Sequence, residues 1–271
     1  MQEELITDVH ASVWAMVRKD YSSYLAVLAF VVAVVVTLAI VTRQFAALFL
    51  ILIPVAACYS YLFRKAHKNF MQQFARRNGL SYLESSHEID SLPGALFKLG
   101  HSQSLFNIVA GEHSGFPMRL FNYSYVTGSG KHRRVHMFTV CEMMVKAELP
   151  SIKLIANSYL PDWMLGTAIR GGKMNLEQDF EKRFSLFVPD GYETEALQIF
   201  TREFLTFMIT RAPDFSIELV EDKLYIYDDR YITKKDELDK LYEVQKHIII
   251  QLGPYINRLA DDFEALKPYY G

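Results

Sequence analysis

The chain has 271 residues, a formal net charge of −2 and 51% hydrophobic residues, and the roughly 207 residues from Lys65 onward suffice for a folded core. Its two cysteines, Cys58 and Cys141, lie in an apolar segment and in the folded part, which excludes a disulfide framework and C-x-x-C zinc or redox chemistry. This cysteine usage fits a reducing cytosol.

The N-terminal part predicts a membrane anchor. Residues 1–23 are expected to form a cytoplasmic amphipathic segment, and residues 24–63, apolar except for Thr42-Arg43-Gln44, predict a transmembrane hairpin with spans at 24–41 and 45–63. Each span covers roughly 27 to 28 Å as a helix, close to the hydrocarbon thickness of a bilayer. A single straight helix would be roughly 60 Å long and would leave Arg43 in mid-membrane. A cleaved signal peptide is the alternative for the first span, which is longer than a usual apolar signal core.

Charges beside the spans predict their orientation. Seven Lys or Arg residues lie before the first span or after the second, whereas the turn carries Arg43 alone. We therefore expect a multi-pass protein with both termini in the cytoplasm. Neither span contains Asp, Glu, Lys, Arg or His, which argues against an ion or proton pathway. Ala29, Ala33 and Thr37 recur at four-residue spacing and predict close packing, either within the hairpin or in a homodimer.

Residues 64–79 are expected to continue the second span as a helical stalk that ends at Asn78-Gly79, and residues 80–271 to form a cytosolic α+β domain. The first half of that domain predicts an antiparallel meander with turns at Ser114-Gly115 and Gly128-Ser129-Gly130-Lys131. The expected extended segments are 80–83, 104–112, 118–127, 135–145 and, after Pro150, 151–156.

The second half of the domain mixes strands and helices. The expected elements are a strand at 185–188, a helix at 193–210 with a restart at Thr201, a hairpin of strands 215–220 and 224–227, and a long C-terminal helix from Thr233 with a kink at Gly253-Pro254. The predicted fold class is therefore α+β: a two-helix transmembrane hairpin, then a mostly antiparallel sheet covered by helices.

Charge is unevenly distributed along the soluble part. Residues 65–175 carry 13 Lys or Arg against seven Asp or Glu, whereas residues 176–230 carry six against 13. Two interpretations stay open: the basic half faces the anionic inner leaflet, or the charges form a solvated surface without preferred orientation.

Residues 176–227 carry a family resemblance. Its elements are Asp179-Phe180 with Phe184, Glu195-Ala196-Leu197 with Thr201, and Phe215 with Lys223-Leu224-Tyr225-Ile226, and it extends loosely to Gly94-Ala95-Leu96-Phe97 and Phe121-Asn122-Tyr123. These hydrophobic frames resemble a bacterial family of membrane proteins of unknown function, which pairs two N-terminal spans with a cytosolic α+β domain. The resemblance implies a location in the bacterial inner membrane and assigns no site residues.

Several short segments match known site motifs only in part. Gly128-Ser129-Gly130-Lys131 is similar to a phosphate-binding loop, but Tyr125 stands at the first required glycine and His132 replaces the Ser or Thr that holds magnesium. A hairpin turn is the better interpretation, and Lys131-His132-Arg133-Arg134 then forms a basic tip that contacts lipid headgroups, nucleic acid or solvent alone.

Neither histidines nor carboxylates form a predicted site. His132 and His136 are roughly 13 Å apart on a strand, too far to share a metal, and Asp228-Asp229 is interpreted as solvated, with a divalent cation as the alternative. We therefore predict no catalytic, cofactor-binding or metal-ligating residues and no cofactor.

The anchor, the stalk and the lack of a catalytic pattern together predict a membrane-anchored, non-enzymatic protein. Its cytosolic domain would bind a protein partner or anionic lipid headgroups, with a homodimer as a further candidate. Nucleic acid is not expected, because no wide basic stripe with interleaved aromatic residues is present. The alternative is an enzyme acting on a lipid or envelope precursor, with a site assembled from residues distant in sequence. The helix at 193–210 between strands argues against a pleckstrin-homology-like module.

Overall fold

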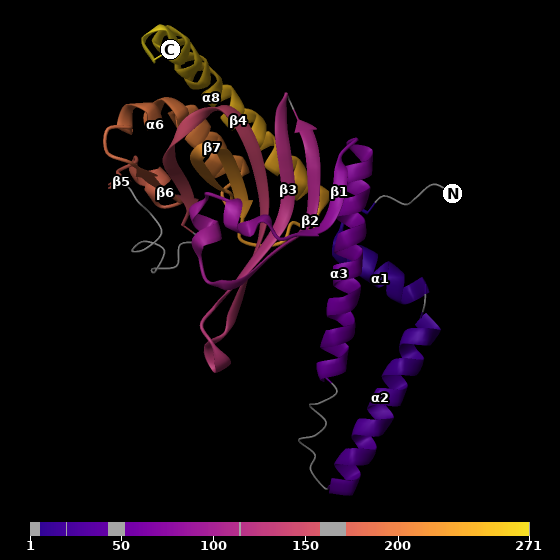
Figure 1. Cartoon of the computed structure of the whole chain (residues 1–271). Helices are drawn as coiled ribbons and strands as arrows, with labels where there is room; N and C mark the ends of the chain where they lie inside the picture. Colours follow the sequence, from indigo (N-terminus) through magenta and orange to yellow (C-terminus); the bar gives the residue numbers. More distant parts are fainter. Residues whose placement is uncertain (1–5, 20, 43–51, 114, 158–171, 271) are drawn as a thin grey trace. The chain divides into compact units, whose positions relative to one another are not determined.

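The computed structural model describes residues 6–19, 21–42, 52–113, 115–157 and 172–270 (Figure 1). The chain divides into two compact units. Unit 1 comprises Met1–Phe74 with Thr233–Lys235, and unit 2 comprises Ala75–Ile232 with Asp236–Gly271.

The helices of unit 1 are α1 (Val9–Lys19), α2 (Tyr21–Thr42) and most of α3 (Leu52–Arg77). Asp8 caps α1, because its carboxylate accepts hydrogen bonds from the N–H groups of His10 (2.7 Å) and Ala11 (3.2 Å). Backbone hydrogen bonds hold the segment Thr233–Lys235 beside the entry to α1: the Val9 N–H donates to the Thr233 carbonyl at 2.9 Å, and the Lys235 N–H donates to the Thr7 carbonyl at 3.0 Å. Backbone groups more than 200 positions apart in sequence are thus hydrogen-bonded to one another within unit 1.

The helices of unit 1 test part of the predicted hairpin. Helix α3 runs through the predicted stalk to Arg77, and Gly79 follows it with a left-handed φ of +67°, which confirms the stop at Asn78-Gly79. The turn at Arg43 and residues 45–51 of the second predicted span lie outside the described residues. Among the described residues no single helix is both long and apolar enough to cross a bilayer, whereas Val9–Lys19 and Ser22–Thr37 meet that criterion together as a pair bent by 81°. The transmembrane hairpin therefore stays a prediction.

Unit 2 is built on a seven-stranded antiparallel sheet, which confirms the predicted α+β class. Its strands are β1 (Ser81–Ser86), β2 (His101–His113), β3 (Phe116–Thr127), β4 (Arg134–Ala156), β5 (Gly172–Met174), β6 (Phe184–Val188) and β7 (Ser216–Asp228). One edge of β4 pairs with β3 and then with β6, and the other edge pairs with β7. The meander is thus β1 to β4; β6 and β7 both pair with β4, and β5 pairs with β6.

Strand β4 is longer than predicted. Residues 135–145 and 151–156 were expected to form separate strands broken at Pro150, but they form one strand of 23 residues. The register against β7 shifts between Met144 and Leu149 and again between Leu149 and Ile152. Proline lacks an N–H and is tolerated where the ladder is irregular, so Pro150 lies within the irregular part of the strand and does not end it.

The predicted hairpin around Glu221-Asp222-Lys223 is wrong, because β7 continues through these residues. Glu221 has a φ of +55° and pairs with Leu149, while Lys223 pairs with Met144. Two residue steps along β7 therefore match five along β4, which is a bulge in the pairing of the two strands and not a reversal of the chain. A cluster of charged residues between two apolar runs resembles a turn in sequence, but here it faces a long partner strand.

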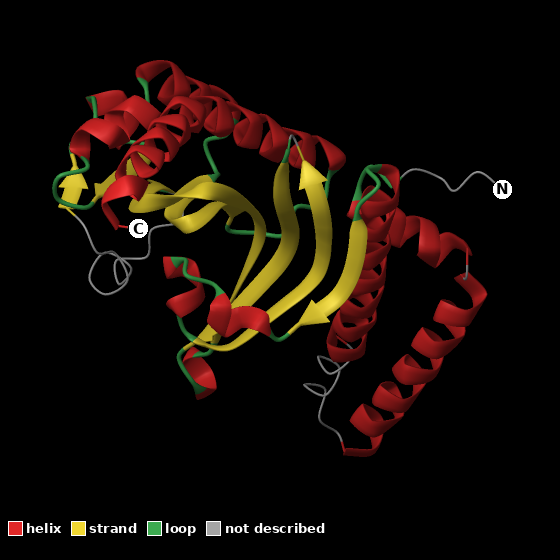
Figure 2. Cartoon of the chain, turned by 45° about the horizontal axis from the view of Figure 1, so that its top comes forward, coloured by secondary structure: helices red, strands yellow, loops and turns green. Residues whose placement is uncertain are grey.

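Helices cover one face of the sheet and short 3₁₀ helices cover the other (Figures 1 and 2). The first layer contains α6 (Glu193–Ile199), α7 (Arg202–Arg211) and α8 (Lys235–Tyr270), and the second contains η2 (Glu88–Ser91) and η3 (Ala95–Lys98). Alternation along β3 serves both layers: Phe121 and Tyr123 pack near Phe97 of η3, whereas Met118 accepts a hydrogen bond from Gln245 of α8. The short helix α5 (Gln178–Glu181) precedes β6.

The predicted helix at 193–210 is two helices. The Thr201 hydroxyl accepts a hydrogen bond from the Phe204 N–H at 3.3 Å and caps α7, so the predicted restart at Thr201 is confirmed. Helix α8 runs without a break past Gly253 and Pro254. The predicted kink there stays a prediction.

Candidate functional site

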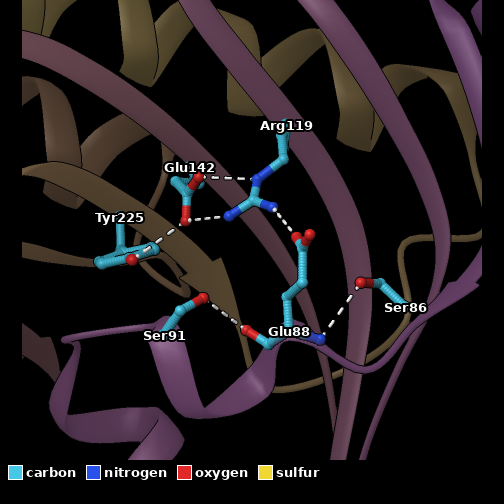
Figure 3. Close-up of polar contacts among 6 residues, drawn as sticks. All are labelled: Ser86, Glu88, Ser91, Arg119, Glu142 and Tyr225. Atoms are coloured by element: carbon cyan, nitrogen blue, oxygen red, sulfur yellow. Dashed lines mark hydrogen bonds and ion pairs between the residues drawn. The ribbon is translucent and has the colours of Figure 1, made fainter.

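A row of polar side chains crosses the sheet on the face covered by η2 and η3. Arg119 of β3 is paired in register with Glu142 of β4, which is paired with Tyr225 of β7. In-register residues on neighbouring strands point to the same face, so the three side chains lie side by side (Figure 3). Glu88 of η2 approaches the same arginine from the covering layer.

Within this row the Glu142 carboxylate accepts three hydrogen bonds. Arg119 donates to Glu142 through Nε at 2.8 Å and through Nη2 at 3.0 Å, and the Tyr225 hydroxyl donates to the same carboxylate at 3.0 Å. The third guanidinium nitrogen of Arg119, Nη1, donates to Glu88 at 3.2 Å. Glu142 is 2% exposed, so its charge depends on these three donors in place of water.

The pKa values of Arg119 and Tyr225 are both shifted by their burial and by their contact with Glu142. Burial lowers the pKa of Arg119, but the hydrogen bond to Glu142 and its charge outweigh that effect, so the net shift is upward. Burial, followed by the negative charge of Glu142, raises the pKa of Tyr225. Both shifts favour the protonated forms of Arg119 and Tyr225. The row therefore ties η2 to the sheet.

A second buried pair ties η3 to the same face. The Glu218 carboxylate accepts from the Ala95 N–H at 2.9 and 3.1 Å, and Lys153 of the adjacent strand lies 3.8 Å away and donates to the Ser151 hydroxyl at 2.9 Å. Burial raises the pKa of Glu218 and lowers that of Lys153. Because both side chains are almost fully buried, the pair fixes the segment around η3 and is closed to a substrate.

A polar relay runs through the sheet towards the loop before α8. Tyr82 donates to Asn107 at 2.7 Å, Asn107 to Asn122 at 3.2 Å, and Asn122 to Thr139 at 3.3 Å. The Thr139 hydroxyl donates to the Arg230 carbonyl at 3.1 Å and accepts from the Ile232 N–H at 2.8 Å. Desolvation on burial raises the pKa of Tyr82 to about 12, so its phenol remains a donor. The relay thus satisfies buried amides and positions the loop.

The predicted solvation of Asp228-Asp229 is wrong for the first residue. Asp228 is 1% exposed and pairs with Arg230 at 3.3 Å, whereas Asp229 is exposed. Burial raises the pKa of Asp228 to about 7, against the opposing effect of Arg230. Arg230 also lies 3.5 Å from Asp214 and 3.8 Å from Glu237. Within the described part of the chain, no group of three or more His, Cys, Asp or Glu side chains is arranged to hold a metal ion.

The turn between β3 and β4 forms an exposed basic tip. We call residues Gly128–Met137 the hairpin tip; it contains the 3₁₀ turn η4 (Gly130–His132). Gly128 has a φ of +68°, and a Cβ there would lie 2.4 Å from the His132 carbonyl oxygen, so only glycine fits. The predicted hairpin turn is confirmed by the flanking pair Thr127–Arg134, and this strand-turn-strand context does not match a phosphate-binding loop.

The two histidines of the hairpin tip serve different purposes. His136 stacks on Tyr125 with ring centroids 4.7 Å apart and lies 2.9 Å from the Thr127 hydroxyl. Burial, and then the nearby Arg134, lowers the pKa of His136, so the ring is neutral at pH 7. His132 is exposed in the turn. Sequence reasoning identified the basic cluster of this tip but missed the buried row of Arg119, Glu142 and Tyr225, because its members are far apart along the chain.

Comparisons with known proteins add little at the level of function. No protein-family model matches the chain, and no curated protein matches it. The crystal structure of the mycobacterial trehalose monomycolate transport factor A, TtfA, aligns with 69% of this chain and 94% of its own, at 12% identity and a TM-score of 0.49. That similarity is too low to support a functional inference. The family resemblance read from residues 176–227 therefore stays a prediction.

Proposed function

We propose that this protein is a membrane-anchored, non-enzymatic binding module of the bacterial inner membrane. In this proposal α2 and the beginning of α3 lie in the bilayer, and unit 2 lies in the cytosol, where it binds a partner.

The observation that carries the proposal is the exposure of large apolar side chains on α2 and at the start of α3. They include Val27 (65%), Phe30 (71%), Val41 (75%), Leu52 (62%) and Ile53 (64%). Water-soluble proteins rarely expose apolar surface that is continuous along a whole helix, and such surface marks a site of membrane or protein contact. The 22 residues of α2 include no charged side chain, and most of them belong to the bent pair that together meets the length and hydropathy criterion for a span.

The flanking charges support a cytosolic unit 2. Arg18 and Lys19 end α1, and Arg64, Lys65 and Lys68 follow the apolar part of α3. Lys and Arg residues next to spans favour the cytoplasmic side. Both Cys58 and Cys141 are unpaired, in keeping with a reducing compartment.

The interior of unit 2 supports binding over catalysis. On the face beneath η2 and η3, the buried charged groups described above are paired with each other: Glu142 with Arg119, and Glu218 with Lys153. Such groups hold a fold together and offer no free acid, base or nucleophile. The hairpin tip, in contrast, presents charged and apolar side chains to solvent, which is typical of a contact surface.

Cysteine labelling in intact cells tests the anchor and its orientation. Cys58→Ala removes one native thiol, and Cys141 is buried and unreactive, so this variant is the blank. Gln44→Cys in that background is expected to react with a membrane-impermeant maleimide in intact cells, whereas Asp190→Cys is expected to react only after permeabilisation. Labelling of Asp190→Cys in intact cells would contradict the orientation, and recovery of the protein in the supernatant of an alkaline carbonate wash would contradict the anchor.

Chemical crosslinking tests the binding role. The full-length protein is crosslinked in native membranes and purified, and bound lipids and proteins are identified by mass spectrometry. Enrichment of one stoichiometric protein or of anionic lipid over bulk membrane is expected. Recovery of lipids and proteins in bulk proportions would contradict a binding module.

A further inference from the structure

We propose that the hairpin tip docks on the surface of an anionic lipid bilayer, with its cations against the headgroups and Val135 and Met137 in the interfacial layer. This inference rests on the proposed membrane anchor and names the partner of unit 2.

No carboxylate in the described part of the chain neutralises the cations of the hairpin tip. Lys131, Arg133 and Arg134 are all exposed, and none of them lies within ion-pair distance of a described carboxylate. The sequence from His113 to Cys141 contains no Asp or Glu at all. Surface cations in folded proteins are usually interspersed with anions, so a run of one sign favours an oppositely charged surface. Anionic headgroups supply that surface.

Two apolar side chains lie next to these cations. Val135 is 48% exposed and Met137 is 43% exposed. They occupy alternate positions of β4 and so share one face of the strand, while Phe138, which is fully buried, belongs to the other face. The pair is therefore left out of the core although it lies within a core strand. Exposed aliphatic residues beside cations are the combination that suits the boundary between headgroups and acyl chains.

The hairpin tip is ordered before it meets a surface. The register continues through Val126–Val135 and Thr127–Arg134, and the His132 N–H donates to the Ser129 carbonyl at 3.0 Å to close the turn. His101 of the neighbouring strand lies 3.1 Å from the Gly128 carbonyl and supports the base of the turn. Figure 1 shows the two strands projecting as a narrow ribbon beyond the rest of the sheet of unit 2. A preformed and projecting tip loses little conformational entropy on docking.

The side chains on the hairpin tip favour lipid over nucleic acid. Proteins that bind single-stranded nucleic acid stack bases on exposed aromatic rings. The tip exposes valine and methionine, and the aromatic side chains at its base, Tyr125 and Phe138, are fully buried. Binding to nucleic acid is therefore an outcome of the test and not part of the proposal.

The test uses the full-length chain reconstituted in vesicles. Ser129→Cys in the Cys58→Ala background carries a polarity-sensitive dye at the hairpin tip, and Asp190→Cys carries the same dye in an exposed turn elsewhere in unit 2 as the matched control. Vesicles of phosphatidylcholine with or without phosphatidylglycerol contain a lipid whose spin label quenches the dye. We expect quenching and a blue shift at position 129 only with phosphatidylglycerol, and neither at position 190.

Substitutions identify the groups responsible. Lys131→Gln, Arg133→Gln and Arg134→Gln together are expected to lower the ratio of docked to free tips about 100-fold, at about fivefold for each cation near an anionic membrane. Val135→Ser with Met137→Ser is expected to lower it about tenfold. The control removes the same charge elsewhere, through Arg211→Gln, Lys240→Gln and Lys246→Gln, and is expected to dock like the parent. Unreactive Cys141 in each variant confirms that the sheet is folded.

Each result decides a separate point. Equal quenching with and without phosphatidylglycerol, or equal loss in the control triple variant, would overturn the docking of the hairpin tip while leaving the anchor intact. A dye response to single-stranded RNA but not to phosphatidylglycerol would assign the tip to nucleic acid. Release of the protein from vesicles by alkaline carbonate would refute the anchor, and with it this inference.

Discussion

Replacing Arg119 by methionine should destabilise unit 2 by about 3 kcal/mol. The change removes two of the three hydrogen bonds that Glu142 accepts, at 2.8 and 3.0 Å, and leaves a 2% exposed carboxylate with Tyr225 as its remaining donor. Removing one partner of a buried ion pair costs about 3 to 5 kcal/mol. The lower end applies because the Arg119 side chain is 28% exposed, so water can reach part of the vacated space.

The matched double variant separates the stranded charge from lost packing. Arg119→Met with Glu142→Met replaces both charges by apolar groups of similar volume, and it should lie within about 1 kcal/mol of the parent because no unpaired buried charge remains. The coupling energy between the two positions should then be about 2 to 3 kcal/mol.

Cys141 supplies the assay, because it is fully buried in β4 next to Glu142. In the Cys58→Ala background, pulses of a maleimide at increasing urea concentration report the fraction of molecules in which β4 is exposed. The urea midpoint and slope give the free energy of unfolding in detergent or in vesicles. A loss below about 0.5 kcal/mol for Arg119→Met, or a double variant as unstable as the sum of the single ones, would refute the assignment of this row as a structural tie.

Three further changes test other parts of unit 2. Asp228 has a pKa of about 7 in the folded protein and 3.8 ordinarily, so the folded state holds an extra proton between these pH values. The contribution of this group to the free energy of unfolding therefore falls as the pH rises from about 4 to about 7. Asp228→Asn should remove this decline, which amounts to up to about 4 kcal/mol in urea titrations followed by circular dichroism. Gly100→Ala should lower the free energy of unfolding by about 3 kcal/mol, because its φ is +62° and the new Cβ would lie 2.4 Å from the Val126 carbonyl oxygen. Gly115→Ala, with φ +82° and no atom within 4 Å of the new Cβ, should lower it by about 1 kcal/mol in the same titration. Thr201→Ala should lower the thermal stability by about 1 kcal/mol through loss of the cap of α7, and Thr201→Ser should retain it; equal effects of the two would contradict the capping role.

Local pattern determined much of the architecture. Alternating apolar residues predicted β3 within two residues of its observed start. Gly79 ends α3, Gly128 lies in the turn between β3 and β4, and Thr201 caps α7, each as predicted, because these effects act within a few residues. The basic cluster of the hairpin tip was visible for the same reason, since its cations are consecutive in sequence.

Tertiary structure decided what local pattern could not. Pro150 and the charged run at Glu221 resemble breaks in sequence, but pairing between β4 and β7 continues past both, because ladder hydrogen bonds on either side outweigh a local preference to turn. The row of Arg119, Glu142 and Tyr225 spans more than 100 positions and exists only through the register of three strands. The exposure of Val135 and Met137 was equally hidden, because whether an apolar side chain enters the core depends on which elements from elsewhere in the chain cover it.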